Sequence, residues 1–428
     1  MNNKFITEKA KQLEIAGEYD VIVAGSGPSG FSAAVTAARN GAKTLIIESQ
    51  SSIGGISTSG LMSHFTGRVN SRLYDEILRR AHEKDLFDCS DKAKIDPELL
   101  KNTYIEMLRE AGVDILLYTF VCDAITENGS VIGVITESKS GRCAYLSRVL
   151  VDATGDGDVA YHAGAEYFLG RESDRKMQPA TLMFKLGGVD MARAVLPPSF
   201  ETTVDTEKGE LQALAQKLLP FPAGHVLLYS STIPGIVTCN MTNCIDIDGT
   251  KAEDLTRAEL VCRSQMEPIV AFLREYAPGY ENCYIISAAS LIGVRETRHF
   301  KGIKQLTEED ILCARQFDDW AVRGAWFNFD VHNMSGASLD RTGVQKHFGQ
   351  ANGYTIPYGC LVPEKLGGLL LSGRNISGTH MAHSNFRAMP ICAGIGEACG
   401  AAAAIAVNDN LELADINIDK LHEILEGN

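Results

Sequence analysis

The sequence predicts an α/β fold in which a Rossmann-like domain, built from a parallel sheet plus a β-meander, carries an inserted α+β domain. A buried strand, a glycine-rich turn, a helix and a second strand follow one another within residues 19–47. Segments 131–137 and 143–151, joined by a Ser-Gly turn, alternate in polarity as an antiparallel meander does. From about 166 onward, proline-marked loops and strand-like stretches replace this pattern, and 253–276 carries a helical apolar stripe.

The first element is a dinucleotide-binding turn. Residues 19–24 (YDVIVA) read as a parallel strand buried on both faces, and the G-x-G-x-x-G sequence of Gly25, Gly27 and Gly30 follows at once. The first glycine permits a tight turn, the second lets backbone amides approach a pyrophosphate, and the third lets helix and strand pack closely. The helix is expected over 31–40 and the second strand over 43–47. This motif does not separate NAD from FAD.

An acidic residue ends the second strand. Glu48 stands eighteen residues after Gly30, where a carboxylate accepts ribose hydroxyls and disfavours a 2′-phosphate. Further along, a helix is expected over 105–114 and a strand over 115–121. A carboxyl-terminal strand, 368–374 (GLLLSGR), precedes an Ala- and Gly-rich helix in which Met389-Pro390 stands at the start, a position that suits proline.

Several of these segments carry a family resemblance. A Gly54-Gly55 pair follows Glu48, the strand 148–155 (RVLVDATG) ends in Ala-Thr-Gly, and the strand 368–374 ends in Gly-Arg. With these motifs the chain resembles the FAD-dependent oxidoreductases of the glutathione-reductase-like superfamily, whose members have two dinucleotide-binding domains. Further matching segments extend the resemblance over nearly the whole chain, least so over 170–285: 293–298 (GVRETR), 306–310 (LTEED), 330–332 (DVH), 354–358, 361–363, 373–377 and 384–390.

The resemblance implies non-covalent FAD and a discontinuous FAD-binding domain. It places that domain at 1–165 and 350–428, with the substrate domain at 166–349. It also implies that the helix beginning at Met389 points its N-terminus at the flavin N1 and C2 carbonyl, where negative charge develops on reduction. The cofactor-binding residues that it implies are Gly25, Gly27, Pro28, Ser29, Gly30, Glu48, Gly54, Gly55, Val121, Ala153, Thr154, Gly155, Gly373, Arg374, Met389, Pro390 and Ile391.

Because a flavin performs the hydride chemistry, the protein has to position a substrate and manage one proton. His332 is a candidate base or acid that Asp330 would orient, with a loop histidine satisfied by a carboxylate as the alternative. Arg295 and Arg298 are candidates to clamp a carboxylate, with an ion pair to Glu296 as the alternative.

Further candidates come from the carboxyl-terminal part. In the sequence His380-Met-Ala-His383, which precedes the helix aimed at the flavin, either imidazole is a candidate to face the reaction centre. Arg387 is a candidate to place a cation near the pyrimidine end of the flavin or the substrate, with a plain salt bridge as the alternative. The H-x-x-H spacing also suggests a metal, but no third ligand is spaced nearby, so we expect none. His64 lies close to the Gly-Gly loop, yet its neighbours resemble no flavin-attachment motif.

Composition excludes several classes of function. Hydrophobic residues are 45% and charged residues 22% of the 428, as in globular proteins. Forty basic against fifty-four acidic residues give a net charge of −14 and no basic stripe, which argues against a nucleic-acid partner. Eleven cysteines without a C-x-x-C pair indicate reduced thiols and the cytoplasm. The apolar stretch 393–407 is too short for a membrane span and predicts a buried helix, so no membrane partner is expected.

The sequence therefore predicts an FAD-dependent oxidoreductase that transfers a hydride between a small organic substrate and flavin N5. Its electron acceptor or donor stays unidentified, and a homo-oligomer is left open. Three alternatives remain: a flavin-dependent monooxygenase, a non-catalytic nucleotide-binding scaffold and a redox-neutral isomerase. A disulfide reductase is disfavoured because no C-x-x-C follows the first flavin loop, and a separate NAD(P)H domain because no second G-x-G-x-x-G is present.

Overall fold

A computed structural model describes residues 6, 8–62, 64–87, 91–337 and 353–427. The predicted domain boundary at 349/350 lies outside these residues. The helices are α1 (Pro28–Arg39), α2 (Arg72–Glu83), α3 (Pro97–Glu110), α4 (Asp158–His162), α5 (Leu211–Leu218), α6 (Ala252–Tyr276), α7 (Glu308–Leu312), α8 (His380–Phe386), α9 (Met389–Asp409) and α10 (Ile418–Glu426).

The main sheet has seven strands in the described part of the chain, in the order β3-β2-β1-β6-β5-β4, with β17 paired to β6. Strands β1, β2, β3, β6 and β17 pair in parallel, whereas β4, β5 and β6 form the antiparallel meander. These strands are β1 (Ile15–Ala24), β2 (Thr44–Ile47), β3 (Asp114–Leu116), β4 (Thr119–Glu127), β5 (Ser130–Ser138), β6 (Gly141–Asp152) and β17 (Leu369–Leu371). The predicted fold class is confirmed.

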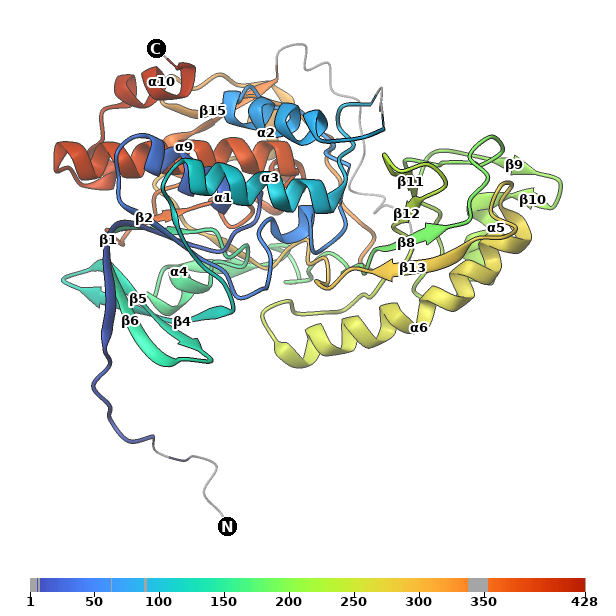
Figure 1. Ribbon diagram of the computed structural model, residues 1–428, viewed down its shortest axis with the longest axis horizontal. Helices are drawn as coiled ribbons and strands as arrows, with labels where there is room; N and C mark the ends of the chain where they lie inside the picture. Colours follow the sequence, from blue (N-terminus) through green and yellow to red (C-terminus); the bar gives the residue numbers. More distant parts are fainter. Residues whose placement is uncertain (1–5, 7, 63, 88–90, 338–352, 428) are drawn as a thin grey trace.

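Helices cover one face of the parallel sheet, and the meander lies on its other side (Figure 1). The carboxyl-terminal ends of β1 and β6 are buried because the sheet is covered on both faces there. Helix α9 packs directly on α1, and two glycines permit the close approach. A Cβ on Gly396 would lie 1.9 Å from the Ser29 carbonyl oxygen, and one on Gly400 would lie 2.3 Å from that of Ala33.

Helix α9 is apolar and long enough to cross a membrane, with a mean hydropathy of 1.6, but 94% of its most apolar window is buried inside the fold. This burial confirms the prediction of a core helix over 393–407. Core helices of soluble proteins can be equally long and apolar, so length and composition alone do not indicate a membrane span.

A second unit has its own core and an antiparallel sheet in the order β11-β12-β8-β13 (Figure 1). Helix α6 confirms the helix predicted over 253–276. Leu61 packs in this second core, while Phe300 and the following buried residues up to Phe329 pack in the first. The strands of this unit are β8 (Phe184–Gly187), β9 (Asp205–Thr206), β10 (Gly209–Glu210), β11 (Leu228–Ser230), β12 (Val237–Cys239) and β13 (Tyr284–Ala288). The predicted domain boundaries themselves stay predictions.

The strand predicted over 115–121 is wrong as a single element. Tyr118 adopts a positive φ of 54°, which breaks the run into β3 of the parallel sheet and β4 of the meander. The helix predicted over 105–114 begins earlier, because Asp96 caps the N-terminus of α3 and Pro97 follows it.

Two further short pairs of strands lie outside these sheets. Strands β7 and β14 pair antiparallel, as do β15 and β16. Their bounds are β7 (Tyr167–Leu169), β14 (Arg298–Phe300), β15 (Trp320–Ala325) and β16 (Tyr354–Pro357). The segment between β13 and β14 carries Arg295 and Glu296 from the second unit to the first.

Candidate functional site

A cavity of about 540 Å³ takes its lining from both units. Its walls come from the turn after β1, the end of β2, the end of β6, the strand end at Gly373, and the sheet of the second unit. Of the predicted cofactor-binding residues, those lining it are Gly25, Gly27, Pro28, Ser29, Glu48, Gly55, Val121, Ala153, Thr154, Gly155, Gly373, Arg374 and Met389. Gly30, Gly54, Pro390 and Ile391 are not part of the lining.

The glycine turn leaves open space where a dinucleotide would lie. Gly25 adopts a φ of +90°, which favours glycine. A Cβ on Gly30 would lie 2.0 Å from the Gly25 carbonyl oxygen, so its lack of a side chain serves packing. A Cβ on Gly27 would meet nothing within 4 Å, although Gly27 lines the cavity. The turn is thus open on the side where a pyrophosphate would be held by backbone amides, and it fits FAD.

Glu48 lines the cavity and is hydrogen-bonded to the glycine turn. Its Oε2 accepts hydrogen bonds from the backbone N–H (2.9 Å) and the hydroxyl (2.5 Å) of Ser26. Its Oε1 accepts from the N–H of Gln50 (2.8 Å) and the hydroxyl of Ser49 (3.1 Å). The carboxylate is therefore fixed at the cavity wall. Its four hydrogen bonds occupy its lone-pair sites, so a ribose hydroxyl would replace one of the serine hydroxyl donors.

The second and third cofactor segments meet beside this turn. Arg374 pairs with Asp156, and Gly155 has a φ of +86° at the point where the Arg374 guanidinium passes over it. Met389 and Cys392, in the first turn of α9, also line the cavity. The N-terminus of α9 therefore lies at the cavity, where its partial positive charge favours an anion or a reduced ring.

At another part of the lining, Arg295, Asp330, His332 and Arg387 come together from three segments. Arg387 donates from Nη2 to the Asp330 backbone oxygen (2.7 Å) and to Asp330 Oδ2 (2.8 Å). Asp330 Oδ2 also lies 3.4 Å from His332 Nε2. Arg295 donates from Nη1 to the Pro179 carbonyl (2.6 Å) and the Thr181 hydroxyl (3.0 Å).

Burial sets the protonation of this group. Burial and the nearby Arg295 guanidinium lower the pKa of His332 from 6.5 to about 4. Although burial opposes ionisation, His332 and Arg387 hold the pKa of Asp330 well below its usual range. Burial and Arg387 lower the pKa of Arg295 to about 10, so that it stays charged at neutral pH. The group then carries two guanidiniums, one carboxylate and a neutral imidazole, and one positive charge is in excess.

His380 and Arg298 lie elsewhere. His380 is not part of the cavity lining; its Nδ1 lies 2.6 Å from Glu296 Oε1, in a buried cluster with His299 and His383. Arg298 donates to Asp158 Oδ1 (2.8 Å) instead of to Glu296. His64 lies edge-on to Tyr229 and is not part of the lining either.

Sequence reasoning missed three polar residues near this group. Gln178 Oε1 accepts from the backbone N–H of His332 (3.2 Å), and its Nε2 is buried without a partner among the described residues. Tyr229 and Asn240 line the cavity from the second unit. Burial raises the pKa of Tyr229 to about 12, so its hydroxyl stays protonated. All three fall within 170–285, where no local motif marks them.

Comparison with known proteins places the chain in a family. A family described as FAD dependent oxidoreductase matches residues 20–425. Thiamine thiazole synthase of Methanococcus maripaludis (strain C7) is 31% identical over 160 residues, which are 34% of this chain and 59% of that protein. Digeranylgeranylglycerophospholipid reductase 1 of Methanococcoides burtonii is 27% identical over 199 residues, 41% of this chain and 46% of that one. The chain thus matches about half the length of these relatives.

Among solved structures, the p-nitrophenol 4-monooxygenase of Pseudomonas putida DLL-E4 is similar in fold, with a TM-score of 0.50 at 10% identity. The alignment covers 96% of this chain and 84% of that one. Since the family match runs over almost the entire chain and the glycine turn fits the cofactor, this protein belongs to the FAD dependent oxidoreductase family and its cofactor is FAD.

Proposed function

We propose that the protein transfers a hydride between a small carboxylate substrate and flavin N5, with FAD held non-covalently. The observation that supports this is Arg295. Arg295 lines the cavity, and its guanidinium is hydrogen-bonded to a carbonyl and a hydroxyl, with no carboxylate of the described residues within 4 Å of it. A buried cation without an anionic partner is costly, and a substrate carboxylate would compensate it.

The side chains around Arg295 support a proton-transfer role. FAD supplies the hydride acceptor or donor. Arg295, oriented by Thr181, holds the substrate carboxylate. His332 is neutral at pH 7, and Nδ1, the ring nitrogen that does not face Asp330, takes the proton of a substrate hydroxyl as the hydride leaves carbon. The ionised Asp330 stabilises the imidazolium that forms, and Arg387 fixes Asp330 in place.

Phe200 supports the same assignment by packing. Its ring meets the His332 ring edge-on, with centroids 5.0 Å apart and an interplanar angle of 83°, and Phe200 also lines the cavity. An aromatic wall against the imidazole restricts its rotation and keeps water from it.

We also propose that the protein belongs to the glutathione-reductase-like superfamily and acts in the cytoplasm. The order of the three cofactor segments supports membership of the glutathione-reductase-like superfamily, and the free cysteines of the described chain support a reducing cytoplasm. The electron acceptor or donor stays unidentified, and we expect a small molecule or a redox protein.

The test is anaerobic reduction of the flavin by a panel of small hydroxy acids and their uncharged amides. We expect bleaching of the flavin with an acid and at least about tenfold slower bleaching with its amide, equivalent to about 1.4 kcal/mol. Arg295→Gln should remove this preference. Arg193→Gln, a change of the same kind at an exposed Arg paired with Glu281, should keep it. Equal rates with acids and amides, or reduction by neutral alcohols alone, would refute the carboxylate assignment.

A further inference from the structure

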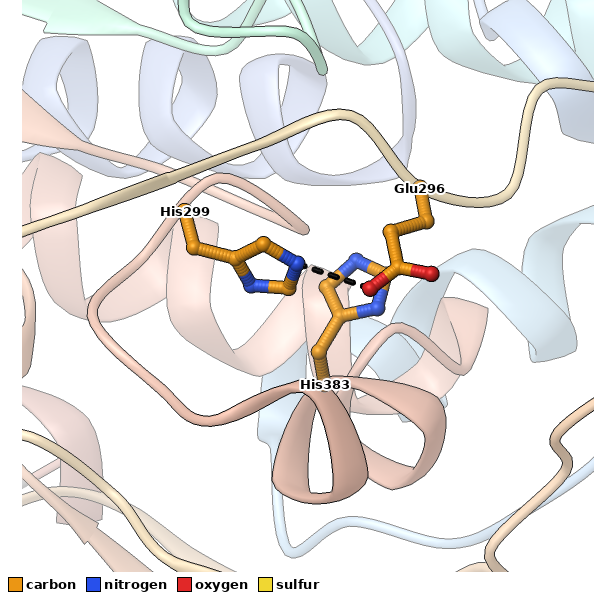
Figure 2. A group of neighbouring side chains, drawn as sticks. All are labelled: Glu296, His299 and His383. Atoms are coloured by element: carbon orange, nitrogen blue, oxygen red, sulfur yellow. Dashed lines mark hydrogen bonds and ion pairs between the residues drawn. The ribbon is translucent and has the colours of Figure 1, made fainter. Parts of the chain in front are cut away.

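Outside the cavity lining, one carboxylate and three imidazoles form a buried cluster, of which Figure 2 shows Glu296, His299 and His383. Glu296 and His299 come from the segment that follows Arg295, and His380 and His383 come from α8. Each pair is spaced by three residues, so that two Glu/His-x-x-His pairs face each other. None of the four side chains lines the cavity, and none has a place in the proposed hydride transfer.

The carboxylate of Glu296 is fully buried and has no Lys or Arg as an ion-pair partner in the described chain. His299 Nε2 lies 2.8 Å and His380 Nδ1 2.6 Å from the same oxygen, Oε1. The other oxygen, Oε2, accepts from the Gln178 backbone N–H at 3.2 Å. Within the described chain no Lys or Arg nitrogen lies within 4 Å of this buried carboxylate, so its partners are two imidazoles and one backbone N–H.

The cluster also has ring nitrogens that nothing satisfies. Nδ1 of His383 and Nδ1 of His299 are buried and have no hydrogen-bond partner among the described residues. One ligand atom from each of Glu296, His299 and His383 lies within 4.8 Å of the others. In a tetrahedral site with bonds of about 2.0–2.1 Å, ligand atoms are about 3.4 Å apart. The present hydrogen-bonded pairs would have to open by less than about 1 Å to admit an ion.

The residues around the cluster hold its side chains in fixed orientations, as the neighbours of metal ligands do. The ring of Phe168 stacks on that of His299 at 4.9 Å with an interplanar angle of 3°, which fixes the imidazole plane. The Gln178 N–H holds the carboxylate from behind. Such outer contacts orient ligands and raise their affinity.

We propose that Glu296, His299 and His383 bind one divalent transition-metal ion of the zinc class, with His380 hydrogen-bonded to the Glu296 carboxylate beside it. Two imidazoles and one carboxylate suit zinc, cobalt or ferrous iron, whereas calcium and magnesium prefer oxygen ligands alone. Three protein ligands leave one tetrahedral position for a fourth donor such as water. It ties the segment of Arg295 to α8, and Arg387 follows His383 by one helical turn. The proposal is independent of the substrate and of the hydride transfer.

The test begins with the FAD-loaded wild-type protein. After treatment with a chelator, it is titrated with Zn²⁺, and in parallel with Co²⁺, whose tetrahedral complexes absorb to the red of the flavin bands. We expect one equivalent per chain, a cobalt band in that region and a melting temperature that rises with the ion. A titration without saturable uptake, or a cobalt spectrum typical of octahedral surface sites, would overturn the proposal and leave a hydrogen-bonded imidazole–carboxylate cluster.

Variants then locate the ion. His383→Asn and Glu296→Gln should each lose the bound equivalent while retaining FAD absorbance, because neither side chain lines the cavity. His162→Asn, the same change at an exposed histidine, should bind metal as the wild type does. If all three proteins bind one equivalent, the ion lies elsewhere and the assignment is wrong. Should the two cluster variants fail to fold, the cobalt titration of the wild type decides alone.

Discussion

His332 is surrounded by groups that keep its ring neutral. Since its pKa is lowered to about 4, with burial as the first cause and Arg295 as the second, the imidazole loses its proton far below neutral pH. For a base that acts in the neutral form, the rate of flavin reduction should be constant above about pH 6 and fall towards pH 4. An ordinary histidine would give a fall near 6.5.

We expect Arg295→Gln to move this acidic limb to higher pH, because the guanidinium is one cause of the lowered pKa. The measurement is the pH dependence of anaerobic flavin reduction under conditions in which substrate is not saturating. An acidic limb that stays in place in Arg295→Gln, or one that His332→Asn leaves intact, would remove His332 from the role of base.

A substitution at Gly27 should affect cofactor binding without affecting folding. Because a Cβ at this position meets no protein atom within 4 Å, Gly27→Val should fold normally but block the pyrophosphate. We expect FAD affinity to fall by at least about tenfold, or about 1.4 kcal/mol, as measured by flavin content and equilibrium titration. Gly30→Ala, by contrast, puts a methyl group against the Gly25 carbonyl and should reduce stability itself. Full flavin occupancy in Gly27→Val would contradict the assigned turn.

At the scale of elements, the packing of α9 on α1 depends on small side chains. A Cβ on Gly400 would lie 2.3 Å from the Ala33 carbonyl oxygen and 2.9 Å from Thr36 Cβ, so that one helix would have to shift. We expect Gly400→Ala to lower the free energy of unfolding by about 1–3 kcal/mol, the usual cost of overpacking. Chemical denaturation with flavin held saturating measures it, and an unchanged midpoint would show that the helices can separate without cost.

Elements marked by hydrophobic periodicity or by turn residues could be predicted from the sequence. Contacts between residues that are distant in the chain could not. The glycine turn between β1 and α1 and the helix α6 follow from local periodicity and turn chemistry. The division of 115–121 at Tyr118 depends on the positive φ of this residue, which no residue pattern indicates. Likewise His299 lies far along the chain from His383, and only the packing of β14 beside α8 brings these two imidazoles together.

For the whole molecule, FAD should act as a stabilising link between the two units, since the cavity that receives it is lined by both. Removal of the flavin should lower the melting temperature, and added FAD should raise it in proportion to the logarithm of its concentration. At a hundredfold excess over Kd the gain is about 2.7 kcal/mol. Thermal unfolding of the deflavinated and reconstituted protein measures this. A rise confined to one of two separate transitions would argue that one unit alone holds the cofactor.

Leu61 belongs to the loop that begins with the Gly54-Gly55 pair, but its side chain is embedded in the core of the second unit. The two units are therefore interlocked by a side chain and not merely joined by connecting peptides. After a protease has cut every connection between the two units, the fragments should still co-elute in size-exclusion chromatography. With Leu61→Asp, the fragments should elute separately.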